Sequence, residues 1–347
     1  MIRGVFGTGQ MNGKQQKRRS DGRESFSIWP WLVFPILPLL GGLVVLHVSY
    51  AESFSFAAYE GALAFIATEK RGFVHFESLM VYVSVAYFHV ALCILASVYA
   101  VFQIRSFPDP IQKHVWRLVI RLFMALIAVG LIARIEGSAL ELTYRNTCEL
   151  LRLAEVSPHL VPDTCRGGPP SLFVWLTGLP VLAGLIAAVL ATAAVSAAAG
   201  PLAQRGESDW REAFARRAAV LQQSFYIASM VLVTSTVSIM LFLQLPLTIA
   251  DEGLTTMVVG SHARAMTVFW GTVFTLTLLA IVAPSAFLMN RAAERHAAAS
   301  DAPSEVRDWL KTHIAVSVPK RLGNIAAVLA PLLVGPAGAL LEKLGGG

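Results

Sequence analysis

The chain has 347 residues, of which 55% are hydrophobic and only 14% are charged, and its mean hydropathy is +0.61. A typical soluble domain carries about 25% charged residues. This composition therefore excludes a soluble enzyme, a nucleic-acid-binding domain and a disordered chain, and it leaves an integral membrane protein. We expect no nucleic-acid partner in spite of the formal net charge of +6.

Residues 1–28 are basic and contain glycine and glutamine, so they are predicted to form a disordered N-terminal segment. Beyond them, a membrane-spanning helix requires about 20 apolar residues. Five windows without Asp, Glu, Lys or Arg are long enough, and a sixth window has arginines only near its ends, where long side chains can reach the headgroups. We predict an all-α, polytopic membrane protein with six transmembrane helices in a domain covering 29–289. The predicted spans are about 29–49, 80–104, 116–135, 171–198, 222–249 and 265–289.

The distribution of lysine and arginine predicts the orientation of these six helices. Cytoplasmic loops of membrane proteins carry an excess of both residues. Placing the N-terminus in the cytoplasm puts 21 of the 28 basic residues on the cytoplasmic side. We therefore expect both termini to be cytoplasmic, and we expect a bacterial inner membrane as the location. The segments on that side are then 1–28, 105–121, 199–221 and 290–347.

Two long loops, 50–79 and 136–170, are predicted to lie on the outer side of the membrane. The second contains Cys148 and Cys165. Two cysteines in one non-cytoplasmic loop are typical of a disulfide, which would stabilise the fold by about 3 kcal/mol if it closed a loop of roughly 15 residues. The alternative is a pair of unrelated free thiols.

The tail that covers 290–347 contains two further elements. Val306, Trp309, Leu310, His313 and Ile314 follow a helical spacing, which predicts an amphipathic helix at the membrane interface. The basic residues Lys311, Lys320 and Arg321 would face the anionic inner leaflet. Residues 322–341 are free of charge but interrupted by proline and glycine. They are predicted to form a broken or re-entrant helix, with an oligomer-packing segment or a seventh span as alternatives.

Ionisable residues inside the membrane are the usual pointers to function, and the six predicted spans contain neither aspartate nor glutamate. His89 lies near the centre of the second span. It could be a haem or metal ligand, a proton relay or a pore-lining group, or simply a neutral histidine bonded across a helix interface. We assign no catalytic residue, metal-ligand set or cofactor, and we favour a protein that is not an enzyme.

Uncharged polar residues gather on particular faces of the second, fifth and sixth predicted spans. Such faces can line a wet passage, and they can equally hold helices together by hydrogen bonds. The candidate residues are Tyr82, His89, Gln223, Thr234, Ser238, Gln244, Thr272 and Thr275.

These patterns lead to three alternative functions. The first is a passage for ions or small solutes, formed by the polar faces and expected to be a homo-oligomer. The second is a non-catalytic subunit or scaffold of a larger membrane complex, which would dock through the tail. The third is a membrane redox or metal protein centred on His89. We place the passage first because Gln, Ser and Thr concentrate on particular helix faces.

Overall fold

The computed structural model describes residues 29–53, 73–133, 172–199, 207–245, 254–299, 303–313 and 329–330. Every long element within these ranges is a helix, as the composition predicts. The helices are α2 (Trp29–Ser53), α4 (Phe73–Arg105), α5 (Asp109–Ala133), α7 (Leu172–Ala198), α8 (Glu207–Gln244), α9 (Leu254–Ala299) and α10 (Pro303–His313). Each of the six predicted spans overlaps one of the first six helices.

Four helices are long and apolar enough to cross a membrane. These stretches lie within α4, α7, α8 and α9 and cover Ser78–Arg105, Gly178–Ala198, Trp210–Gln244 and Gly260–Ala298. In α2, a shorter apolar stretch covers Val33–Val45. Exposed aliphatic and aromatic side chains cover the outside of the bundle, among them Tyr87 and Leu95 of α4 and Phe287 of α9. An outer surface of this kind suits a lipid environment, because lipid tails solvate apolar side chains that water does not.

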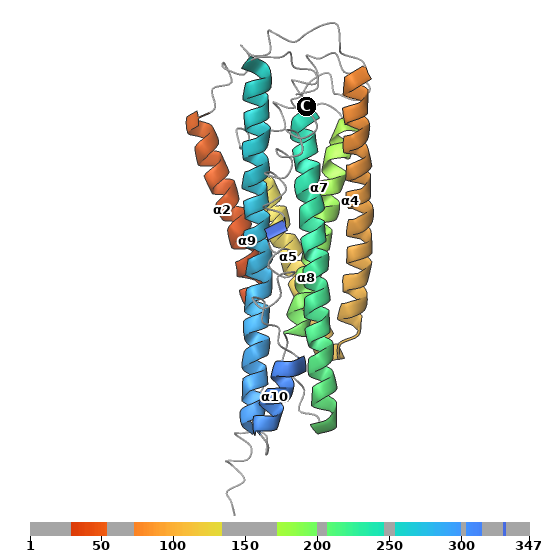
Figure 1. Ribbon diagram of the computed structural model, residues 1–347, viewed down its shortest axis with the longest axis vertical. Helices are drawn as coiled ribbons and strands as arrows, with labels where there is room; N and C mark the ends of the chain where they lie inside the picture. The colour runs from red at the N-terminus through yellow and green to blue at the C-terminus, as the bar shows by residue number, and fades with distance from the viewer. Residues whose placement is uncertain are drawn as a thin grey trace, which may run out of the picture.

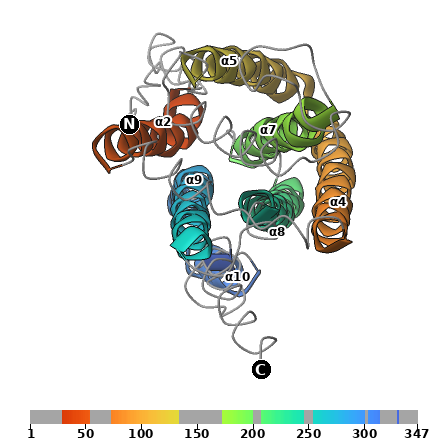
Figure 2. The same ribbon diagram turned by 90° about the horizontal axis from the view of Figure 1, so that it is seen from above.

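The long helices run side by side (Figure 1), and α7 occupies a central position, in contact with α4, α5 and α8 (Figure 2). Its C-terminal half is rich in alanine, and Ala193, Ala194 and Ala197 are completely buried. Small side chains let neighbouring helix backbones approach closely. The alanine-rich half of α7 therefore packs on several helices at once, as expected for a helix with too little polar content to line a passage.

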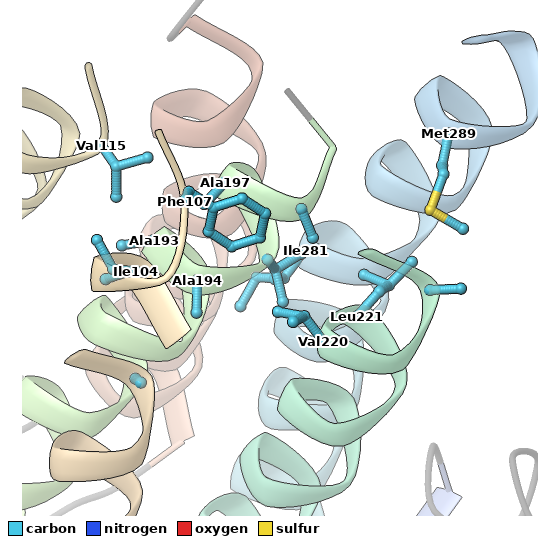
Figure 3. Close-up of a cluster of buried hydrophobic side chains, with 14 of the residues drawn as sticks. Ile104, Phe107, Val115, Ala193, Ala194, Ala197, Val220, Leu221, Ile281 and Met289 are labelled. Carbon is cyan, nitrogen blue, oxygen red and sulfur yellow. The ribbon is translucent and has the colours of Figure 1, made fainter. Parts of the chain in front are cut away.

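The largest apolar cluster lies around this alanine-rich segment. Ile104 and Phe107 from α4 and its turn lie beside Ala193, Ala194 and Ala197 (Figure 3), and Val115 from α5 and Leu221 from α8 belong to the same cluster. Ile104, Val115 and Leu221 expose 1% or less of their surface. The cluster thus fixes α4, α5, α7 and α8 relative to one another at one end of the bundle.

A short turn joins α4 to α5 at this same end. Ser106 and Phe107 donate backbone hydrogen bonds to the last carbonyls of α4, and Gln112 Nε2 donates to the carbonyl oxygen of Phe107 at 2.6 Å. Arg216 Nη2 of α8 donates to the carbonyl oxygen of Ser106 at 2.8 Å. The described parts of the segments that we predict to be cytoplasmic therefore meet at one end of the molecule.

The tail helix α10 begins at Pro303, where the sequence places an amphipathic helix. It packs against α9 at the end of the bundle (Figure 1). Two of its apolar side chains pack on protein: Val306 is 2% exposed, and the Trp309 ring lies 5.2 Å from that of Trp210 in α8. Tertiary packing therefore buries Val306 and part of Trp309, whereas their spacing in the sequence predicts that they face the membrane interface.

Close packing of α2 on α9 depends on Gly42. A Cβ atom built at Gly42 would lie 2.8 Å from Cγ2 of Val273, whereas one built at Gly41 meets no atom within 4 Å. We expect Gly42→Leu to lower stability by about 1–3 kcal/mol, because overpacking forces the helices apart. Thermal unfolding in detergent measures this effect, with Gly41→Leu as the control. Equal losses in the two variants would contradict close packing at Gly42.

Candidate functional site

The predicted polar residues of α4 and α8 come together where these two helices pack. Hydrogen bonds and close polar contacts join His89, Tyr99 and Gln103 of α4 with Gln223, Thr234 and Ser235 of α8. Together with Tyr82, whose ring contacts Phe242 of α8, and Ser238, one turn beyond Thr234, they form what we call the polar seam. From Tyr82 to Gln103 the helix rises by about 30 Å at 1.5 Å per residue. That length is similar to the thickness of the hydrocarbon core of a bilayer.

His89 lies near the middle of the polar seam and is 2% exposed. Its Nδ1 atom is 2.7 Å from Oγ1 of Thr234 in α8. Its Nε2 atom is 3.4 Å from Oγ of Ser235 and 3.4 Å from Sγ of Cys93, one turn further along α4. The imidazole therefore links α4 to α8 inside the bundle.

The hydrogen bonds of Thr234 decide the role that its hydroxyl plays toward His89. Oγ1 of Thr234 lies 3.0 Å from the carbonyl oxygens of Met230 and Val231, so its single hydrogen points back into α8. Oγ1 then accepts a hydrogen bond from Nδ1–H of His89. The backbone carbonyl of Pro180 in α7 accepts a further hydrogen bond from the ring. Ser235 Oγ donates to the Val231 carbonyl at 2.9 Å, and the Cys93 thiol lies within reach of Nε2.

Gly184 of α7 provides the space that the imidazole occupies. A Cβ atom at this position would lie 3.3 Å from Nε2 of His89 and 3.7 Å from Oγ of Ser235. Hydrogen in place of a side chain lets α7 close the junction of α4 and α8 over the ring. The environment of His89 is therefore built by three helices that are distant in sequence.

A second set of hydrogen bonds lies about three to four turns from His89, nearer the turn between α4 and α5. Tyr99 Oη donates to Oε1 of Gln223, and Gln103 Nε2 donates to Oη of Tyr99 at 2.6 Å. Since Gln103 and Tyr99 are four residues apart on one helix, the three side chains form a chain of donors and acceptors. They extend the polar seam toward the end of the bundle where Arg216 bonds the turn.

Two buried hydroxyl groups of α8 have no hydrogen-bond partner among the described residues. They are Oγ of Ser224 and Oγ of Ser238, whose residues are 3% and 7% exposed. Ser238 lies one turn beyond Thr234, about 40° around the helix from it. Buried polar groups are nearly always hydrogen-bonded, and water commonly supplies the missing partner.

The remaining predicted residues lie apart from these contacts. Thr272 of α9 is exposed and donates to the carbonyl oxygen of Val268 at 2.9 Å. Thr275 is 6% exposed, and its hydroxyl has no partner among the described residues. Gln244 is half-buried at the end of α8, beyond Phe242, whose ring contacts Tyr82. The structure thus joins the predicted faces of α4 and α8, while no described hydrogen bond connects the α9 threonines to them.

Several other predicted residues lie outside what the structure describes. Cys148, Cys165, Lys320 and Arg321 belong to ranges without a described position, as does most of 322–341. Lys311 lies in α10, but its side chain is not among those described. Within the described ranges, no group of three or more His, Cys, Asp or Glu side chains is placed to hold a metal ion.

Sequence reasoning missed Tyr99, Gln103 and Gly184. The two polar residues could have been found by following the face of His89 along α4, because Tyr99 and Gln103 are spaced by one helical turn. Gly184 carries no such signal, since any of the glycines in the span could face lipid or protein.

Comparisons with protein-family models, with curated proteins and with solved structures find no match for this chain. The class of the protein therefore rests on its fold. An all-helical bundle with four helices able to cross a membrane, covered by exposed apolar side chains, is a multi-pass membrane protein.

Proposed function

We propose that this protein forms a passage for ions or small polar solutes across a bacterial inner membrane. In this proposal all six long helices span the bilayer, both termini are cytoplasmic, and the passage follows the polar seam. The observation that carries the proposal is the alignment of the seam with the bundle axis over about one bilayer thickness. A permeating ion or solute loses its contacts with bulk water, and a chain of hydroxyl, amide and imidazole groups can replace those contacts.

The unpartnered hydroxyls support a wet seam over a dry one. If the polar residues served only to hold α4 and α8 together, each buried hydroxyl would be expected to bond protein. Ser238 in the seam and Ser224, next to Gln223, depart from that expectation among the described residues, as does Thr275 of α9 outside the seam. Water at Ser224 and Ser238 would extend the hydrogen-bonded groups on either side of the His89–Thr234 pair.

We base the orientation of the passage on the end of the bundle where several helix ends meet. The α4–α5 turn, the start of α8, the end of α9 and α10 meet there, and each contributes arginine. We assign this end to the cytoplasm because of the excess of basic residues in cytoplasmic segments.

Flux into liposomes tests the proposal. The purified protein is reconstituted, and proton flux, potassium flux and glycerol-driven swelling are recorded against empty liposomes. Thr234→Val removes the acceptor of His89 Nδ1–H, and we expect a loss of about tenfold in flux, the effect of one buried hydrogen bond worth about 1–1.5 kcal/mol.

Thr272→Val is the matched control, because it makes the same chemical change on an exposed face of α9. We expect wild-type flux from this variant. Folded wild-type protein that transports none of the three probes would overturn the passage proposal, and equal losses in the two variants would remove the polar seam as its path.

A further inference from the structure

One face of α5 combines exposed basic and exposed apolar side chains in a fixed order. Lys113, Arg117 and Arg121 are all exposed and follow one another at intervals of four residues. In an ideal helix they lie within about 80° of one another around the axis and rise by about 12 Å from first to last. We call these three residues the basic face of α5.

The opposite face of α5 is already used for packing. Val115 and Leu118 are completely buried, and Val119 and Leu122 are 5% and 3% exposed, in the cluster around α7. Helix α5 lies at the edge of the bundle between α2 and α7 (Figure 2). The basic face is therefore turned away from the core, toward whatever surrounds the protein.

Exposed apolar side chains continue the basic face over the following turns of α5. Ile120, Met124 and Ile127 are 62%, 61% and 54% exposed. Cations at the start of the helix are thus followed by open aliphatic surface. An anionic phospholipid has the same order of chemistry, with a phosphate at its head and acyl chains beyond it.

The three cations need an anion that the described protein does not supply. None of the three side chains has an ion-pair or hydrogen-bond partner among the described residues. Asp109, the one acidic residue in the first turn of α5, is four residues before Lys113, a spacing at which opposite charges attract, but it is eight residues before Arg117 and too far to pair with it. Arg121 lies five residues, or about 8 Å along the helix axis, inside the predicted span that begins at residue 116. A phosphate can accept two parallel hydrogen bonds from its guanidinium.

We infer that the basic face of α5 binds the headgroup of an anionic phospholipid, whose acyl chains lie along Ile120, Met124 and Ile127. This site differs from the polar seam, which is buried between α4 and α8, and it requires only that α5 lies in the membrane. Its failure would leave the passage proposal untouched.

Native mass spectrometry tests the inference on the full chain in detergent. The protein is mixed with phosphatidylglycerol and phosphatidylcholine of identical acyl chains, and the dissociation constant of the tightest bound lipid is compared. We expect at least about tenfold tighter binding of phosphatidylglycerol, since each basic residue near the headgroup adds to the attraction. The triple variant K113Q/R117Q/R121Q is expected to lose this preference.

Two further variants separate a site from general charge. R264Q/R291Q/R307Q removes three exposed arginines from α9 and α10 and should keep the preference. R117K/R121K retains the positive charge and should keep most of the preference for phosphatidylglycerol. This result would also show that the surface tolerates substitution. Equal binding of the two lipids, or an equal loss in R264Q/R291Q/R307Q, would overturn the inference. If soluble glycerol phosphate at a similar concentration displaced phosphatidylglycerol, the ligand of the basic face would be a free phosphate and not a lipid.

Discussion

Phe214→Ala is expected to destabilise the protein more than any other single substitution considered, by about 3–5 kcal/mol. Phe214 of α8 is 1% exposed and belongs to the cluster that joins α4, α5, α7, α8 and α10. Its ring lies 6.0 Å from that of Trp210 and 6.2 Å from that of His296 in α9. Truncation would leave a cavity under α10, because the surrounding helices are held by many other contacts and cannot collapse into it.

Phe287→Ala is the matched control for this prediction. Phe287 of α9 is 63% exposed, so the same change removes a side chain that lines no cavity. Reversible unfolding in mixed micelles measures both variants, with tryptophan fluorescence as the signal because Trp210 and Trp309 adjoin the altered site. A Phe214→Ala variant as stable as Phe287→Ala would show that α10 and the ends of α8 and α9 are not packed as described.

Gly184→Leu is expected to reduce both stability and flux. A Cβ atom already lies 3.3 Å from Nε2 of His89, and the rest of a leucine side chain has no space between α4, α7 and α8. Overpacking of this kind costs about 1–3 kcal/mol. Since the ring must move, the hydrogen bond between His89 and Thr234 should break, and flux along the polar seam should fall at least as far as in Thr234→Val.

The control for Gly184→Leu lies in the same helix. A Cβ atom at Gly178 meets nothing within 4 Å, so Gly178→Leu makes the same change without a clash. The gain in helix propensity on replacing glycine, about 1 kcal/mol, is common to the two variants and cancels in their comparison. Thermal unfolding and liposome flux are recorded for both. If Gly178→Leu is impaired as severely as Gly184→Leu, the crowding of His89 is not the cause.

Comparison of the Phe214 and Gly184 variants distinguishes a loss of stability from a loss of flux. Phe214 lies at the end of the bundle with α10, whereas Gly184 lies beside His89 near the centre of the polar seam. A Phe214→Ala variant that is less stable but retains flux, together with a Gly184→Leu variant that loses flux, would support a passage along the seam. Parallel loss of both properties in both variants would favour polar residues that serve only for packing.

The sequence by itself determined the class of protein and the positions of its helices. Long windows without charge require helices in a bilayer, because an unbonded backbone group in hydrocarbon costs several kcal/mol. The apolar spacing of Val306 and Trp309 likewise predicted the tail helix that begins at Pro303. Local periodicity is sufficient for such features, since each depends on residues that are neighbours along the chain.

Only the tertiary structure decided which polar faces meet. His89 and Thr234 are separated by 145 residues, and no spacing within either helix indicates that their side chains bond. The same physical reason explains why Thr272 faces outward and why Gly184 is the glycine beneath the ring. The shortage of charged residues in the chain predicts that its helices must cross a membrane, but the order in which they pack depends on shape complementarity between distant segments.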